Sequence, residues 1–193
     1  MNLANVERGE FMNNFWDYYL LLEKNFLEAL NYVELDKRNF GAFSKEFIKQ
    51  YQTIGAELDT LFKLACGFEL KEDKNMRVYA KVLLEEFPGI KSVKITVMGT
   101  DIILCPFKDW SDKKDAEPLS WWKGFNGVKH NRIEGVIGAN LENILLILSA
   151  LYILEKYVIK KAEYNPDVPN RESELFKIEG WETNTSVYER FYV

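Results

Sequence analysis

Residues 144–154 read ILLILSALYIL, and this apolar run decides how the rest of the chain must fold. The run is eleven residues long and lies between the acidic residues Glu142 and Glu155, so it is too short to cross a bilayer, which takes about 20 apolar residues. A helix that is apolar on nearly every face has to be buried. The sequence therefore predicts a central core helix that Asn140 caps, that runs to about Tyr164, and that has no membrane contact.

Two amphipathic helices that cover this core precede it in the chain. In residues 7–33, and again in residues 43–65, large apolar side chains recur every three or four residues. Gly67 marks the end of the second helix, because glycine readily adopts the left-handed conformation that closes a helix. The link at residues 35–39 is short, so we expect the two helices to form an antiparallel hairpin.

The remaining pattern adds one helix and a little β-structure. Residues 71–87 predict a third helix, which a Pro-Gly pair ends. The apolar period then changes to two, which predicts a small inserted β-hairpin at about residues 92–105. The C-terminal tail, about residues 166–193, contains one further short strand at residues 175–178. The expected fold class is mainly α, a single helical bundle over residues 1–193.

The composition fits a globular protein of a reducing compartment. With 193 residues, of which 47% are hydrophobic and 28% charged, the chain can bury a core without disulfides. Cys66 and Cys105 both lie in apolar segments, where free thiols are expected. The first residues lack the basic flank and apolar stretch of a secretory signal, so we expect a cytoplasmic protein. The net charge of -5 argues against a general nucleic-acid coat protein, although a local basic face could still bind phosphate.

The segment that carries chemistry is residues 121–132, WWKGFNGVKHNR, which holds the only histidine of the chain. On a helix, Trp122, Asn126 and His130 are spaced by four and share one face, and Lys123 lies beside Asn126. An imidazole exchanges protons near neutral pH, and a neighbouring cation holds phosphate and stabilises developing charge. Such a set suits RNA cleavage without a metal. The alternative is that His130 merely ends a helix and binds its last carbonyl groups.

The run WWKGFNGVKHNR, followed by the apolar helix containing LLILSALYILEKY, resembles the HEPN superfamily (higher eukaryotes and prokaryotes nucleotide-binding), and within it the abortive-infection-like bacterial members. The second helix with residues 55–59, and the hairpin ending in residues 105–107 before Trp110, follow the same order. The resemblance implies a helical bundle that dimerises and an RNA-cleaving arginine–histidine pair separated by about four to six residues. Here Lys123 stands at that spacing before His130, with a point charge in place of a two-pronged guanidinium.

These observations predict a HEPN-like RNA-binding protein or a metal-independent endoribonuclease, and the resemblance implies bacterial phage defence or stress response. His130 would be the general acid or base, while Asn126 and Lys123 would position and neutralise the scissile phosphate. Three further side chains are expected to bind RNA, namely Lys129, Arg132 and Trp122. The alternative function is a catalytically silent HEPN-like module for interaction or dimerisation.

Two neighbouring features leave alternatives open. Glu57 of the second helix could orient His130, or could simply form a solvated helix edge. Trp121 and Trp122 could stack bases, or fill the core or a dimer interface. A homodimer that buries aromatic surface around this pair is expected, since a small acidic chain with so many aromatic residues has apolar surface to spare. No metal-ligand spacing of cysteines and histidines is present, so neither a metal nor another cofactor is expected.

Overall fold

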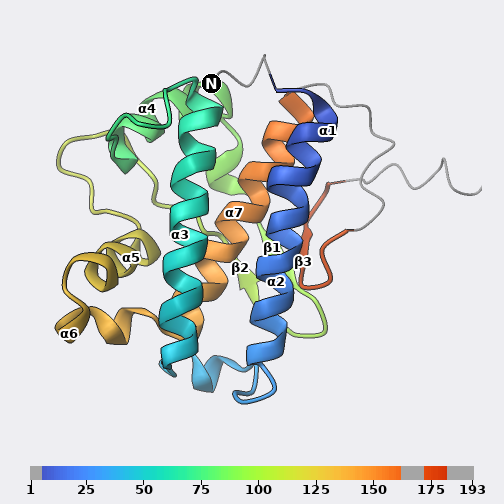
Figure 1. The fold of residues 1–193 in the computed structure, drawn as a ribbon, viewed down its shortest axis with the longest axis vertical. Helices are drawn as coiled ribbons and strands as arrows, with labels where there is room; N and C mark the ends of the chain where they lie inside the picture. The colour runs from blue at the N-terminus through green and yellow to red at the C-terminus, as the bar shows by residue number, and fades with distance from the viewer. Residues whose placement is uncertain (1–5, 162–171, 182–193) are drawn as a thin grey trace, which may run out of the picture.

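The computed structural model describes residues 6–161 and 172–181, which form a mainly helical fold with one small sheet (Figure 1). Three long helices lie alongside one another: α2 (Asp17–Ala29), α3 (Lys45–Cys66) and α7 (Leu141–Lys161). Shorter helical segments complete the bundle: α1 (Arg8–Phe11), the π-helix η2 (Met12–Trp16), η3 (Lys37–Asn39), α4 (Met76–Glu86), η4 (Ile90–Ser92), α5 (Ser120–His130), α6 (Arg132–Gly135) and η5 (Val136–Gly138).

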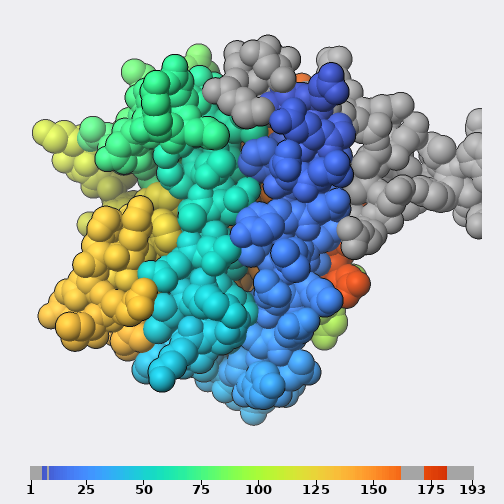
Figure 2. All heavy atoms as spheres, in the orientation of Figure 1, coloured from blue at the N-terminus to red at the C-terminus, as the bar shows by residue number. Residues whose placement is uncertain are grey.

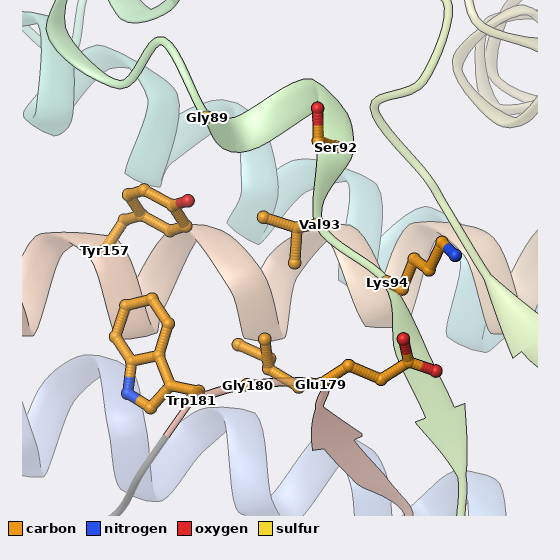
Figure 3. Close-up of a pocket in the computed structure, with 9 residues that line it drawn as sticks. Gly89, Ser92, Val93, Lys94, Tyr157, Glu179, Gly180 and Trp181 are labelled. Atoms are coloured by element: carbon orange, nitrogen blue, oxygen red, sulfur yellow. The ribbon is translucent and has the colours of Figure 1, made fainter.

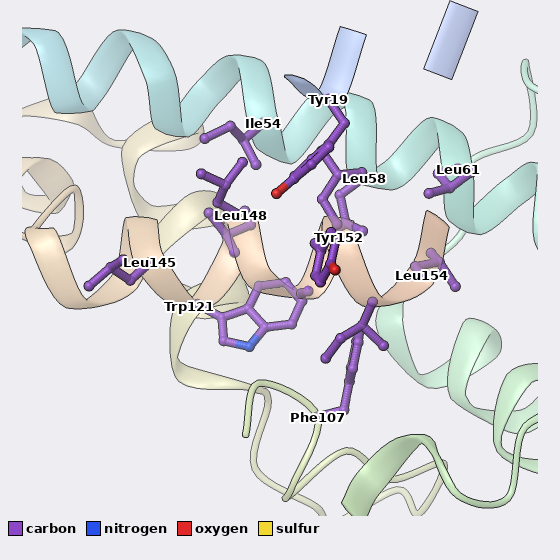
Figure 4. Close-up of a cluster of buried hydrophobic side chains, with 14 of the residues drawn as sticks. Tyr19, Ile54, Leu58, Leu61, Phe107, Trp121, Leu145, Leu148, Tyr152 and Leu154 are labelled. Atoms are coloured by element: carbon purple, nitrogen blue, oxygen red, sulfur yellow. The ribbon is translucent and has the colours of Figure 1, made fainter. Parts of the chain in front are cut away.

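Helix α7 is the central core element, as the sequence predicted. Every side chain from Leu148 to Lys156 is buried, and Figure 4 shows α7 side chains meeting those of α3 and Tyr19. The Asn140 side chain caps the helix, because its Oδ1 accepts a hydrogen bond from the backbone N–H of Asn143 (3.0 Å). The predicted extension beyond Lys161 lies outside the described residues. Within the described part of the chain, no helix combines the length and apolar character needed to span a membrane.

The predicted hairpin of two long helices is confirmed, but the first helix, expected over residues 7–33, contains the π-helical segment η2 and ends earlier. Asn31 and Tyr32 donate backbone hydrogen bonds to carbonyl groups three residues back, so the chain tightens and α2 ends at Ala29. Helix α3 begins where the Ser44 hydroxyl accepts a hydrogen bond from the Phe47 N–H (3.0 Å). It ends at Gly67, whose φ of 72° is the left-handed conformation expected for this glycine.

The third helix starts later than the sequence predicted. We expected it from residue 71, but α4 begins at Met76. The Asn75 side chain accepts hydrogen bonds from the backbone N–H groups of Arg77 and Val78, at 3.1 and 3.2 Å. This capping interaction sets the start of α4, because asparagine favours the N-cap position over a helix interior.

The small sheet has three strands in the order β2-β1-β3, built from β1 (Ile95–Val97), β2 (Ile103–Leu104) and β3 (Phe176–Ile178). β1 and β2 are the predicted hairpin, in which Ile95 lies opposite Leu104. β3 confirms the predicted strand in the tail, and it pairs antiparallel with the other edge of β1, so that Ile178 also lies opposite Ile95. The sheet packs on α7, since the ring centroids of Tyr152 and Phe176 lie 5.9 Å apart.

A buried carboxylate ties the segment before β3 to α2. Glu23 is only 2% exposed, and its oxygens accept hydrogen bonds from the hydroxyl groups of Tyr19 and Ser173. They also accept from the backbone N–H groups of Glu174 and Leu175, at 2.9 and 3.2 Å. These donors satisfy the buried charge, so Glu23 holds the C-terminal strand in place.

Candidate functional site

Helix α5 carries the segment that the sequence singled out, and its apolar side fixes it to the core. Trp121 Nε1 donates a hydrogen bond to the carbonyl oxygen of Pro106 (2.8 Å), and the Tyr51 hydroxyl donates to the carbonyl oxygen of Trp121. The Phe125 ring fills the space beside Gly55 of α3, where a Cβ atom would lie 2.3 Å from a ring carbon. These contacts give α5 one orientation, with its other side toward solvent.

The arm formed by α6 and η5 lies against α5 through backbone contacts. A Cβ atom on Gly135 would lie 2.4 Å from the carbonyl carbon and oxygen of Gly127, and one on Gly138 would lie 3.2 Å from the Cα atom of Gly124. Glycine permits this close approach because it has no side chain. Asn143 Nδ2 of α7 also donates a hydrogen bond to the Gly138 carbonyl oxygen (3.0 Å). Figure 2 shows α5 and the arm projecting from the body of the molecule.

The exposed residues of α5 and the arm form what we call the α5–α6 surface: Ser120, Lys123, Lys129, His130, Asn131, Arg132, Ile133, Glu134 and Ile137. Lys129 Nζ lies 5.7 Å from the centroid of the Phe125 ring, and Arg132 Nη2 donates a hydrogen bond to Gln52 Oε1 (3.3 Å). Among the described residues, no acid forms an ion pair with Lys123, Lys129 or Arg132. The surface holds three cations and one acid, Glu134, which accepts a hydrogen bond from Asn131 Nδ2 (2.7 Å), so its net charge is positive.

The three residues expected to be catalytic lie along one side of α5. Lys123 and His130 are two turns apart on this helix, which separates their Cα atoms by about 10 Å, and the half-buried Asn126 lies between them. His130 is exposed at the end of α5, and no described residue hydrogen-bonds to its ring. His130 does end α5, as the alternative expected, but its ring forms no hydrogen bond to the last carbonyl groups of that helix.

The expected stacking of bases on Trp122 is also wrong. Trp122 is 8% exposed, and its ring lies 5.1 Å from that of Phe125 and 6.3 Å from that of Phe62 of α3, centroid to centroid. Trp121 is only 1% exposed, so neither ring offers surface for the expected dimer interface. Both indole rings fill the core because they continue the apolar stripe of α5 with Phe125 and Val128.

Glu57 has no part in orienting His130. It is half-buried on α3, and no hydrogen bond or ion pair joins it to His130 or to any other described residue. Its electrostatic neighbour is Glu155 of α7, a fully buried carboxyl whose two oxygens have no hydrogen-bond partner. Burial raises the pKa of Glu57 to about 7; burial and the charge of Glu57 raise the pKa of Glu155 well above its ordinary value.

Sequence reasoning misses this acid pair, because it treats Glu155 as the charged flank of an apolar run. The sequence does not distinguish Glu155 from an exposed acid, because the burial that α7 keeps through Lys156 is visible only in the structure. In the described part of the chain, no group of three or more His, Cys, Asp or Glu side chains could hold a metal ion.

Comparisons with protein-family models, with curated proteins and with solved structures find no match to this chain.

Proposed function

We propose that the protein is a HEPN-like protein that binds RNA through the α5–α6 surface. The observation that supports this most strongly is the set of exposed cations Lys123, Lys129 and Arg132, which form no ion pair within the described residues and outnumber Glu134, the one exposed acid of this surface. Such cations attract phosphate groups, which supply most of the affinity of a protein for nucleic acid. Because the chain as a whole carries a net charge of -5, RNA would be confined to this local surface.

The same surface supports a cleavage reaction without a metal. The neutral imidazole of His130 takes the proton of a 2′-hydroxyl group while the 2′-oxygen forms a bond to the adjacent phosphorus. The bond from phosphorus to the 5′-oxygen breaks, and this oxygen takes a proton from water; the products are a 2′,3′-cyclic phosphate and a 5′-hydroxyl. Lys123 offsets the charge on the phosphate oxygens and Asn126 donates a hydrogen bond to them. The proton held by His130 then neutralises the remaining hydroxide.

Binding is tested with a fluorescein-labelled single-stranded RNA and fluorescence anisotropy. Replacing Lys123, Lys129 and Arg132 together by alanine should reduce the slope of log K against log salt by about 2, since each phosphate contact to a single strand contributes about 0.7. The matched control replaces the exposed residues Lys91, Lys113 and Lys114 by alanine, which changes the net charge equally. If both triple variants lose the same affinity, or if the unmodified protein does not bind, the proposed surface is wrong.

Cleavage is tested on the same RNAs with the products separated on a gel. His130→Ala should abolish cleavage and leave binding intact, and EDTA should have no effect. Lys123→Arg should raise the rate, because a guanidinium contacts phosphate through two hydrogen bonds. If the unmodified protein and both variants are equally inactive while binding persists, the protein is an RNA-binding protein without nuclease activity.

The second candidate function is a catalytically silent module for interaction or dimerisation. The observation that favours it is the pair Ile133 and Ile137, which are 91% and 63% exposed at the edge of the basic surface. Large apolar side chains with this much exposure are typical of protein contacts. Light scattering tests a homodimer through this pair: Ile133→Ser with Ile137→Ser should convert a dimer into a monomer, whereas a monomeric unmodified protein across the micromolar range contradicts dimerisation.

A further inference from the structure

A pocket lies between the C-terminal part of α7, the segment before β1 and the segment after β3 (Figure 3). Its volume is about 260 Å³, slightly below the range of sites that take drug-sized ligands, so it suits a small metabolite. The rings of Tyr157 and Trp181 form one end, with centroids 5.4 Å apart. Val93 lies beside them in Figure 3, and Ile178 also lines the pocket, so part of its wall is aromatic and apolar.

Two opposite charges lie at the other end of the pocket. The backbone N–H of Glu179 donates a hydrogen bond to the carbonyl oxygen of Lys94 (3.0 Å), which holds the two residues side by side. Their side chains nevertheless form no ion pair with each other or with another described residue. The hydroxyl group of Tyr157 also lines the pocket and has no hydrogen-bond partner in the described residues. An ammonium and a carboxylate are thus both free to bind a ligand.

We propose that this pocket binds a free amino acid with an aromatic side chain. The ring of the ligand lies against Tyr157 and Trp181, which contribute apolar burial and ring contacts. Its α-carboxylate accepts a hydrogen bond from Lys94 Nζ, and its α-ammonium donates one to the Glu179 carboxylate. A zwitterion satisfies both side chains together, whereas a ligand with one charge leaves one of them unpaired. The pocket shares no residue with the α5–α6 surface, so it is a site separate from the proposed RNA interface.

Gly89 offers a way to fill the pocket without disturbing the fold. Its φ and ψ of -81° and -11° suit any residue, and a Cβ atom there would touch only the Tyr157 hydroxyl, at 3.7 Å. Gly89→Leu should therefore keep the backbone and place its side chain in the ligand's space. Gly41→Leu is the matched control, because a Cβ atom at Gly41 meets nothing within 4 Å.

Isothermal titration calorimetry with L-phenylalanine tests the proposal. Affinity should fall about tenfold or more for 3-phenylpropionate, which lacks the ammonium, and for phenethylamine, which lacks the carboxylate. Glu179→Gln should weaken L-phenylalanine similarly but leave 3-phenylpropionate unchanged, and Lys94→Ala should leave phenethylamine unchanged. Gly89→Leu should abolish binding and Gly41→Leu should retain it.

Three results would overturn the proposal. The first is no binding of L-phenylalanine, L-tyrosine or L-tryptophan to the full-length chain. The second is unchanged binding to Gly89→Leu, which would place the ligand elsewhere. The third is binding of L-leucine or of adenosine monophosphate as tight as that of the aromatic amino acids, which would mean that the pocket selects a ligand of another class.

Discussion

Replacing Glu23 by glutamine should destabilise the protein strongly, although the change removes only a charge. The Glu23 carboxylate is buried and accepts four hydrogen bonds, from Tyr19, Ser173, Glu174 and Leu175. Glutamine keeps one acceptor oxygen but places an NH₂ group where one carboxylate oxygen accepts from the Glu174 N–H. The Glu174 N–H then faces another donor, and the hydrogen bonds that remain are weaker because their acceptor is no longer charged.

The expected loss in the free energy of unfolding is about 2–4 kcal/mol, from one buried unsatisfied donor and the weakened charge-assisted bonds. For a chain of this length, 1 kcal/mol shifts Tm by about 2–4 °C, so thermal unfolding followed by circular dichroism should show a decrease of about 5–15 °C. Amide hydrogen exchange should also show faster exchange at Glu174 and Leu175. Glu28→Gln, an exposed change on the same helix, is the control. Equal melting of the two variants with both amides still protected would refute the reasoning.

Further changes test the packing and the buried acids. Gly135→Ala should destabilise the protein by about 1–3 kcal/mol in urea unfolding, because its Cβ would lie 2.4 Å from backbone atoms of Gly127. Gly127→Ala should be neutral or stabilise the protein by up to about 1 kcal/mol, since its Cβ meets only an atom at 3.8 Å. Equal changes in the free energy of unfolding for the two variants would contradict this difference in available space. Leu148→Asp should unfold the protein, because an unpaired carboxylate in the core costs several kcal/mol, and a soluble variant with unchanged melting would contradict the central place of α7. The pKa of Glu57 is raised to about 7 from 4.5, so between these pH values the folded form retains a proton that the unfolded chain loses. The free energy of unfolding should therefore fall by about 1–2 kcal/mol as pH rises from about 4.5 to 7. Glu57→Gln should reduce this fall. An unchanged pH dependence in that variant would exclude Glu57 as its source.

The helices could be predicted because their signals are local. The spacing of apolar side chains identifies α2 and α3, an unbroken apolar run identifies α7, and the local signals Gly67 and Asn140 mark where α3 ends and α7 begins. The β1–β2 hairpin is equally local. The pairing of β3 with β1 could not be predicted, because it joins residues about eighty positions apart and depends on the tertiary anchor at Glu23. Nothing near Glu23 in the sequence distinguishes it from an exposed helical acid.

Part of the candidate site could be predicted because its signal is also local. Helix geometry alone places Lys123 and His130 along one side of α5, so their common side follows from their spacing. Trp122 belongs to the buried apolar stripe of α5, which continues through Phe125 and Val128. Interpreting Trp122 by its spacing from His130 ignores this stripe, and burial of about 150–250 Å² of aromatic surface outweighs the gain from stacking a base.

The two proposed sites lie near opposite ends of α7. Asn143, near the start of α7, holds the arm that carries Arg132, and Tyr157, near its end, lines the amino-acid pocket. Coupling between distant sites requires an element with two arrangements that both ligands bias. The structure shows α7 in one arrangement, packed by α3, α2 and the sheet and capped at its start by Asn140. The proposed amino-acid pocket and the proposed RNA surface share no residue, so a negative result for one proposal leaves the other untouched.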